Sequence, residues 1–203
     1  MSHVRLSLIL MLCLGASICA QEKKPAVVAF SEPAMGEVGT TRVLYWNQEK
    51  NEAAGELTIN FGRPAWKKEY ENQALFGLAT KGKVWRLGKD YWTMLDTNVP
   101  LKIAGKEVPV GLWYLGLHRS EDGASWSLAF IDPLKARRIR LDPFAINKAP
   151  VEFKIPMTTE NVGEMNEKLT ITLSPQKENI KNVTLRISWG KLQLMAPVEV
   201  FLE

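Results

Sequence analysis

Seven tryptophans are the side chains of this sequence whose chemistry stands out most. An indole has a flat apolar face on which a sugar ring can stack, and it carries one N–H donor. The competing interpretation is that indoles fill a core, since each buries a large area. Trp126 and Trp189 lie in alternating apolar runs and are expected in the core. In all, at least four of the seven tryptophans are expected to have a structural role.

A candidate binding site is predicted in residues 83–96. If residues 88–90 form a three-residue hairpin loop, Arg86 faces Trp92 across the hairpin. An exposed arginine stacks on an indole for roughly 0.5–1 kcal/mol, which is a sufficient structural reason for the pair. The functional alternative is that Arg86 and Trp92, with Arg63, present a flat platform to a sugar or an anionic group. The same register places four residues on the core face: Trp85, Leu87, Tyr91 and Leu95.

Few side chains in this sequence could bind a metal ion or act as a nucleophile. Cys13, Cys19 and His3 lie in a predicted leader, which leaves His118 as the one histidine of the mature chain. This ligand count excludes structural zinc sites and His-rich catalytic zinc sites, and a Cys nucleophile is excluded too. There is no G-x-S-x-G elbow, and the nearest serine, Ser120, sits in a turn, so His118 is predicted to be a plain strand-end residue. Without a phosphate loop or dinucleotide fingerprint, we predict no metal site and no cofactor.

Charged residues leave one catalytic alternative open. Asp and Glu number 22 together, and a glycosidase needs only two carboxylates at the right separation, although abundance does not establish pairing. A net charge of +4, spread over both signs, argues against nucleic acid as the main partner. A basic run between Asp132 and Asp142 is predicted to be a surface strand, since it alternates: Lys135, Arg137, Arg138 and Arg140.

The first twenty residues predict a secretory signal peptide. Arg5 precedes an apolar run at 6–14, and small residues follow up to Ala20. The run is too short to span a bilayer, and no later stretch is long and apolar enough, so no transmembrane segment is expected in the mature chain. Lipid attachment at Cys19 is less favoured, because Ile18 occupies a position that needs a small residue. The protein is therefore expected in the periplasm or outside the cell after cleavage near Ala20.

Alternation of apolar and polar residues dominates the chain from Glu56 onward. This period is typical of strands with one face in a core, and turn formers follow about every ten residues. Helical periodicity is poor outside 69–78 and 162–167. The sequence predicts an all-β fold, an antiparallel β-sandwich of the jelly-roll kind or a related barrel, with little helix. The predicted organisation is a signal peptide at 1–20, an N-terminal arm and first strands at 21–55, and a β-sandwich domain at 56–203.

Several short motifs follow one another between residues 57 and 131. They are FGRP at 61–64, ALFG at 74–77, GKVWRLG at 82–88, GKEVPVG at 105–111 and the strand around Trp126. With these motifs the chain resembles a family of exported bacterial proteins, domain of unknown function 2911. The resemblance implies a secreted β-rich domain and no known activity, cofactor or catalytic residue. The chain departs from the family pattern after Arg86, where such proteins show Thr, Gly, a small residue and Asn-Glu.

Two functions are compatible with these observations. The first is an exported non-catalytic binding or structural module of the cell envelope or exterior, with a glycan as the favoured ligand. The second is a carboxylate-dependent hydrolase acting on an envelope polymer. The missing catalytic motifs favour the first function. Two carboxylates converging in one aromatic-lined cleft would instead indicate the hydrolase.

Overall fold

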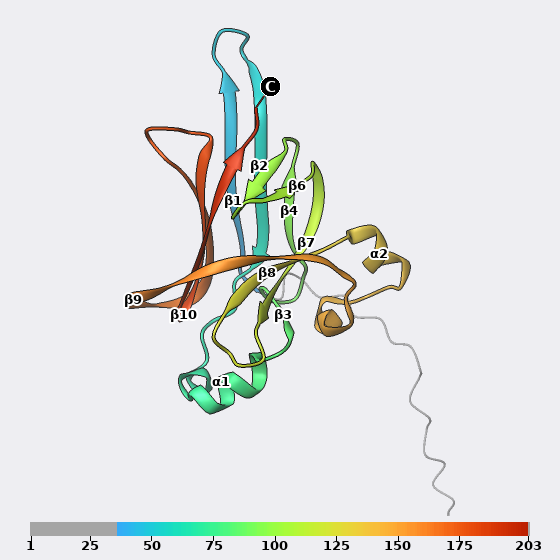
Figure 1. Cartoon of the computed structure of the whole chain (residues 1–203), viewed down its shortest axis with the longest axis vertical. Coiled ribbons are helices and arrows are strands. Elements are labelled where there is room, and N and C mark those ends of the chain that lie inside the picture. The colour runs from blue at the N-terminus through green and yellow to red at the C-terminus, as the bar shows by residue number, and fades with distance from the viewer. Residues whose placement is uncertain (1–35, 203) are drawn as a thin grey trace, which may run out of the picture. The chain divides into compact units, whose positions relative to one another are not determined.

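The computed structural model describes residues 36–202 (Figure 1). The predicted signal peptide, its cleavage near Ala20 and residues 21–35 of the predicted arm lie outside the described residues. No helix in the described part of the chain is long and apolar enough to cross a membrane.

The strands of the described residues form one large antiparallel sheet. Their order is β1 (Val38–Asn47), β2 (Glu52–Gly62), β4 (Thr93–Thr97), β7 (Gly111–Arg119), β8 (Trp126–Ile131), β9 (Val151–Pro175), β10 (Asn182–Val200), β5 (Leu101–Ile103) and β6 (Lys106–Val108), with β3 (Val84–Arg86) paired to β7. The predicted antiparallel all-β class is confirmed. The finer prediction of a sandwich or a barrel is not, because the strands are linked in a single sheet.

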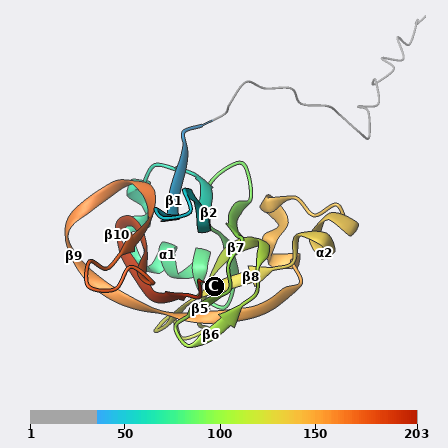
Figure 2. The ribbon, with the colours of Figure 1, turned by 90° about the horizontal axis from the view of Figure 1, so that it is seen from above.

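Strand β9 is long enough to pair with two neighbouring strands, one after the other along its length. Its first residues pair with β8, and from Thr158 onward it pairs with β10. The segment after β2 also bonds to β9, because Trp66 N donates to Glu167 O at 2.6 Å and Leu169 N donates to Pro64 O at 3.0 Å. Figure 2 shows β9 curving from the side of β8 toward β1 and β2. The sheet therefore folds back on itself.

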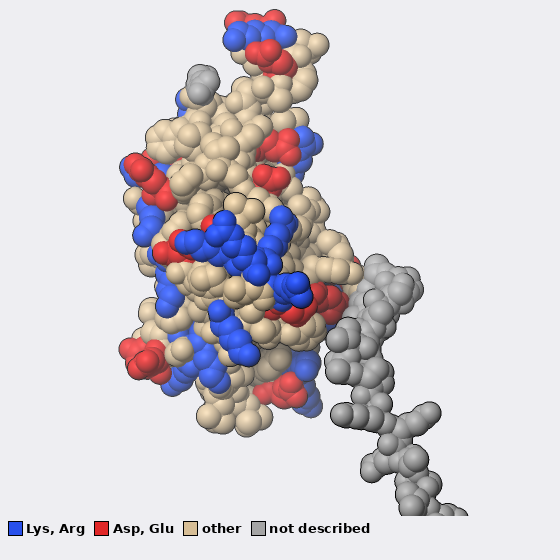
Figure 3. All heavy atoms as spheres, turned by 90° about the vertical axis from the view of Figure 1, so that its right-hand side faces the viewer, with Lys and Arg blue, Asp and Glu red and all other residues tan. Residues whose placement is uncertain are grey.

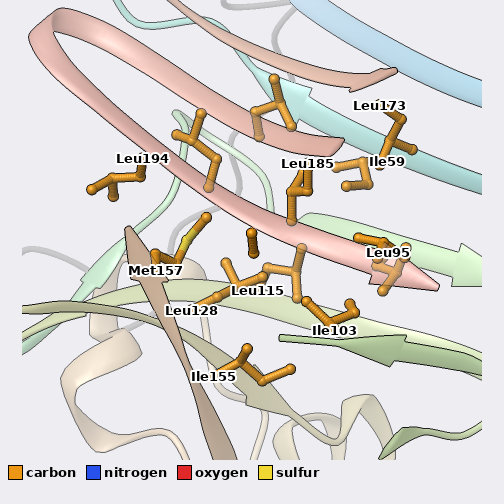
Figure 4. Packing of buried hydrophobic residues seen from close by; sticks show 14 of the residues in the cluster. Ile59, Leu95, Ile103, Leu115, Leu128, Ile155, Met157, Leu173, Leu185 and Leu194 are labelled. Atoms are coloured by element: carbon orange, nitrogen blue, oxygen red, sulfur yellow. The ribbon is translucent and has the colours of Figure 1, made fainter. Parts of the chain in front are cut away.

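The main core lies on the concave side of this folded sheet. The alternation predicted for β2 holds, since Leu57 and Ile59 are buried while Thr58 and Asn60 are not. Ile155 of β9 and Leu185 of β10 meet Leu128 of β8 in the same cluster (Figure 4). Burial of each such side chain stabilises the fold by about 1.5–3 kcal/mol.

The outer face of the sheet carries a smaller cluster covered by two short helical segments. These are α2 (Pro133–Arg138) and η2 (Pro143–Lys148), and their Ala136 and Ile146 pack with Tyr114 and Ile131. Asp132 accepts from Leu134 N at 2.7 Å and Asp142 accepts from Phe144 N at 2.8 Å, so both aspartates are N-caps followed by proline.

The basic run was therefore wrongly predicted as a surface strand. Lys135, Arg137 and Arg138 belong to α2, because the Asp-Pro pair before them starts a helix. Figure 3 views this side of the molecule and shows Lys and Arg side chains gathered on it.

Of the two predicted helices, one is confirmed and one is wrong. Residues 69–78 fall on η1 (Lys68–Glu71) and α1 (Gln73–Thr80), and Asn72 caps α1 by accepting from Ala74 N at 3.0 Å. Residues 162–167 lie in β9 instead. There, pairing with β10 opposite overrides the local helical pattern.

The hairpin predicted at 83–96 is also wrong. Both β3 and β4 pair with the edge of β7 that faces away from β8, Arg86 opposite Gly116 and Thr93 opposite Leu115. β3 and β4 are therefore two parts of one interrupted strand, and residues 87–92 form an excursion, a loop that leaves the strand between them. Thr93 Oγ1 donates to Leu87 O and so closes the base of this loop. Trp85, Leu87 and Leu95 do face the main core as predicted, whereas Tyr91 is 52% exposed.

Candidate functional site

Six aromatic rings gather on the main-core side of the sheet, and we call them the inner aromatic cluster. They are Trp66, Tyr70, Phe76, Trp85, Trp126 and Trp189. Trp189 is central, with ring centroids 4.9 Å from Trp66, 5.3 Å from Tyr70 and 5.1 Å from Trp85. Because three strands and the η1–α1 segment contribute rings, the cluster depends on the tertiary fold.

A glycine in β10 makes room for Trp66. Gly190 has a φ of +58°, and a Cβ built on it would lie 2.2 Å from Cδ2 of Trp66. The ladder between β10 and β9 is irregular on both sides of Gly190. The residue before Gly190, Trp189, is fixed by its Nε1, which donates to Pro64 O at 2.9 Å. The bulge in β10 therefore leaves room for the Trp66 ring and orients the Trp189 ring.

Arg119 joins α1 to the sheet beside these rings. Its guanidinium lies 5.5 Å from the Phe76 ring centroid and 5.2 Å from that of Trp126. Its Nη1 donates to Thr80 Oγ1 at 3.1 Å and its Nε donates to Gly123 O at 3.0 Å. The arginine thus combines cation–π contacts with one hydrogen bond to α1 and one to the turn between β7 and β8.

An open groove of about 360 Å³ runs along this part of the cluster, and we call it the aromatic groove. Trp66, Tyr70, Phe76 and Trp126 line it, and its exposed rim is polar: Glu71, Gln73, Thr159 and Lys191. Nε1 of Trp66 is buried and has no hydrogen-bond partner among residues 36–202. Such orphan donors are uncommon in native structures.

A second, more enclosed pocket of about 260 Å³ adjoins the groove, sharing Tyr70 and Leu192 with it. We call it the apolar pocket. Its lining is mainly aliphatic and aromatic: Pro64, Ala65, Lys67, Tyr70, Trp85, Arg86, Leu87, Gly88, Lys89, Leu117, Leu169, Ile187, Trp189 and Leu192. Arg86 borders it, but strand alternation directs the Arg86 side chain to the outer face.

Carboxylates are sparse in both cavities. In the described part of the chain, Glu71 is the one carboxylate residue that lines the aromatic groove, and none lines the apolar pocket. Within residues 36–202 there is also no group of three or more His, Cys, Asp and Glu that could hold a metal ion. His118 lies in β7, and its pKa is lowered first by burial and then by the positive charge of Lys154.

The three residues predicted to form a platform each have a different partner. Arg63 pairs with Glu37 and donates through Nε to Leu169 O at 3.1 Å. Arg86 lies over the ring of Phe144, 4.0 Å from its centroid. Its Nη1 is buried without a hydrogen-bond partner in the described part of the chain.

Trp92 belongs to a separate stack on the outer face. Its ring lies 4.6 Å from that of Tyr114 at an interplanar angle of 3°. Arg137 of α2 donates to Tyr114 Oη at 3.1 Å, and we call these three residues the outer aromatic stack. The cross-strand pair of Arg86 with Trp92 is not formed, because β3 and β4 do not pair with each other. A role of Arg63, Arg86 and Trp92 in ligand binding stays a prediction.

Sequence reasoning missed Trp66, Tyr70, Phe76 and Arg119 as site residues. A usable indication was present in the motifs that carried the family resemblance. Pro64 of FGRP, Phe76 of ALFG and most of GKVWRLG border one or both cavities. Motifs that are far apart along the chain and meet at one cavity indicate a site.

Comparison with known proteins gives a family and no closer relative. No curated protein and no solved structure matches the chain. The family model matches residues 46–198, which is most of the chain. The protein therefore belongs to the family described as Protein of unknown function (DUF2911).

Proposed function

We propose that this protein is a non-catalytic binding module of the cell envelope or exterior that binds a glycan in the aromatic groove. The observation that carries the proposal is the composition of the groove, which has an aromatic floor and a rim with both donors and acceptors. A sugar ring presents C–H faces to aromatic rings and hydroxyls that both donate and accept hydrogen bonds.

The rim supplies each type of partner that a hydroxyl needs. Glu71 is an acceptor, Lys191 is a donor, and Gln73 and Thr159 are both.

Binding is favoured over hydrolysis by the distribution of carboxylates. A carboxylate-dependent glycosidase uses two carboxyl groups roughly 5–9.5 Å apart on either side of the bond that it cleaves. Glu71 alone lines the aromatic groove, so the second carboxylate of such a mechanism is missing from its lining.

The assignment to the envelope or exterior rests on the predicted signal peptide. Intact-mass measurement of protein exported by a producing cell tests it, with cleavage after Ala20 as the expected result. A mass that retains Met1, or a lipid adduct on Cys19, would contradict it.

A glycan-array screen of the mature protein, followed by titration with the best glycan, tests the binding site. Replacing Gln73 and Lys191 with Ala removes two rim hydrogen bonds and should weaken binding about tenfold or more. The matched control replaces Gln176 and Lys177, which are equally exposed but lie in the turn between β9 and β10. The control should bind normally.

Three outcomes would count against the proposal. One is a screen without any glycan bound, and another is an equal loss of affinity in the control variant. The third is release of shorter fragments from the bound glycan, which would support the hydrolase alternative.

A further inference from the structure

The apolar pocket differs chemically from the groove beside it. Leu87 of the excursion after β3, Leu117 of β7 and Ile187 of β10 line it and are each 1% exposed. A cavity with such a lining favours an apolar occupant over water, which would find few hydrogen-bond partners. The walls are therefore suited to hydrocarbon.

The size of the pocket limits the length of that hydrocarbon. A dry apolar cavity of about 150 Å³ is enough to hold benzene, with its six carbons. In proportion, about 260 Å³ holds a chain of roughly ten carbons.

The charges on the pocket lining have one sign. Lys67 and Lys89 border it, and no Asp or Glu does. Lys67 Nζ lies 3.4 Å from Glu69 Oε1, and Lys89 Nζ lies 3.6 Å from Asp90 Oδ2, so both ammonium groups are within ion-pair range of a carboxylate. Their flexible stems allow each ammonium group to follow an anion at the pocket mouth while its methylenes remain on apolar surface.

The polar groups of the lining also argue against a sugar in this pocket. Among the described residues whose polar side chains line it, Tyr70 can accept as well as donate, whereas Lys67 and Lys89 only donate. A sugar hydroxyl needs acceptors as well, whereas a carboxylate or phosphate head needs donors alone.

We infer that the apolar pocket is a second binding site, for a single hydrocarbon chain of about ten carbons with an anionic head at the lysine-bearing mouth. The chain lies against the aliphatic walls and the head lies between Lys67 and Lys89. The inference goes beyond the proposed function, because it assigns a different cavity and a different class of ligand.

Titration with decanoate, followed by calorimetry and by tryptophan fluorescence, tests the inference, since Trp85 and Trp189 line the pocket. Decyl phosphate separates a carboxylate from a phosphate head. Decanol and decyltrimethylammonium test the charge. Both anions should bind, decanol should bind more weakly, and the ammonium compound should bind least. Replacing Lys67 and Lys89 with Gln should weaken decanoate binding about fivefold, whereas Lys68→Gln should leave it unchanged.

A crossed pair of variants locates the ligand. Ala65 and Ala124 are both exposed, but Ala65 lines the pocket and Ala124 lines the groove. Ala65→Phe should abolish decanoate binding and spare glycan binding, and Ala124→Phe should do the reverse, with unfolding curves confirming that both variants fold. Failure of glycan binding alone would leave this inference standing.

The inference is overturned by any of three results. The first is no binding of any ten-carbon amphiphile at millimolar concentration. The second is binding of decyltrimethylammonium as tight as that of decanoate. The third is decanoate binding that survives Ala65→Phe and is lost in Ala124→Phe.

Discussion

The inner aromatic cluster and the outer aromatic stack place similar residues on opposite faces of one sheet with different results. The inner cluster has Arg119 beside its rings, and the outer stack combines one indole, one phenol ring and an arginine. In the inner cluster Trp66 meets Trp189 at 79° and Tyr70 at 67°, so ring edges meet ring faces. In the outer stack Trp92 and Tyr114 are parallel within 3°.

This difference shows why aromatic content alone does not identify a binding site. Parallel rings cover each other's faces, and α2 adds Arg137 to the Tyr114 hydroxyl, so the outer stack consolidates the fold. Edge-to-face contacts are as favourable as offset stacking, but the inner rings come from separate segments of the chain. The two cavities are found beside the inner cluster, where such angles occur.

The largest effect is expected at the centre of the inner cluster. Trp189 is 4% exposed, and Trp189→Ala should lower the free energy of unfolding by about 3–5 kcal/mol, because it leaves a cavity among three other rings. Denaturant unfolding measures this change. A loss no larger than that of Trp92→Ala would remove the distinction between the two regions.

Gly190→Ala should be the next most damaging change. The residue has a positive φ, and the added Cβ would overlap the Trp66 ring, so we expect a loss of about 2–4 kcal/mol together with weaker glycan binding. Gly163 is the control, since nothing lies within 4 Å of a Cβ added there. Equal unfolding curves for the two variants would show that Trp66 does not depend on Gly190.

Trp92→Ala separates the structural and the functional interpretation of the outer stack. Loss of a half-buried ring against Tyr114 should cost about 1 kcal/mol. Glycan binding should be unchanged if the groove is the site. If Trp92→Ala instead abolishes binding, the platform predicted from Arg63, Arg86 and Trp92 is the better description.

The smallest effect is expected at an exposed ion pair just before β1. Hydrogen bonding from Lys168, aided by the charges of Arg63 and Lys168, lowers the pKa of Glu37 below its usual value. A lowered carboxyl pKa stabilises the fold above the unfolded-state pKa near 4.5, and the contribution is lost as pH falls through the folded-state pKa.

Glu37→Gln should therefore lower stability slightly at pH 7 and make no difference in strong acid. Denaturant unfolding at several pH values measures this, with the exposed Glu178→Gln as a control that should match the wild type at every pH. A difference from the wild type that persists below the folded-state pKa would contradict the assignment.

The sequence allowed the strands and much of the core to be predicted, because alternation is a local signal. Trp126 and Trp189 were expected in the core and are buried there. The register of residues 83–96 was wrong because β7, the partner that decides it, is not the neighbouring segment: its paired residues lie from 16 positions (Asp96 to Leu112) to 34 positions (Val84 to His118) further along the chain. The turn-forming residues around Gly88 are compatible with a hairpin loop and also with the excursion that is observed.

The aromatic groove was beyond sequence reasoning for a related physical reason. Trp66, Tyr70 and Phe76 lie in a segment with little strand periodicity, and their meeting with Trp189 depends on the bulge at Gly190. Neither pattern nor propensity brings residues 66 and 189 together. The Asp-Pro starts of α2 and η2, by contrast, were visible signals of helices.

The bonds that join residues 64–66 to residues 167–169 also set an order for folding. They connect segments separated by about a hundred positions, so they cannot form until most of the chain has been synthesised. Sheets dominated by such distant pairings fold in roughly milliseconds to seconds, far more slowly than helical bundles. During that interval the edge of β9 is uncovered, and we expect it to be a segment exposed to pairing with other chains.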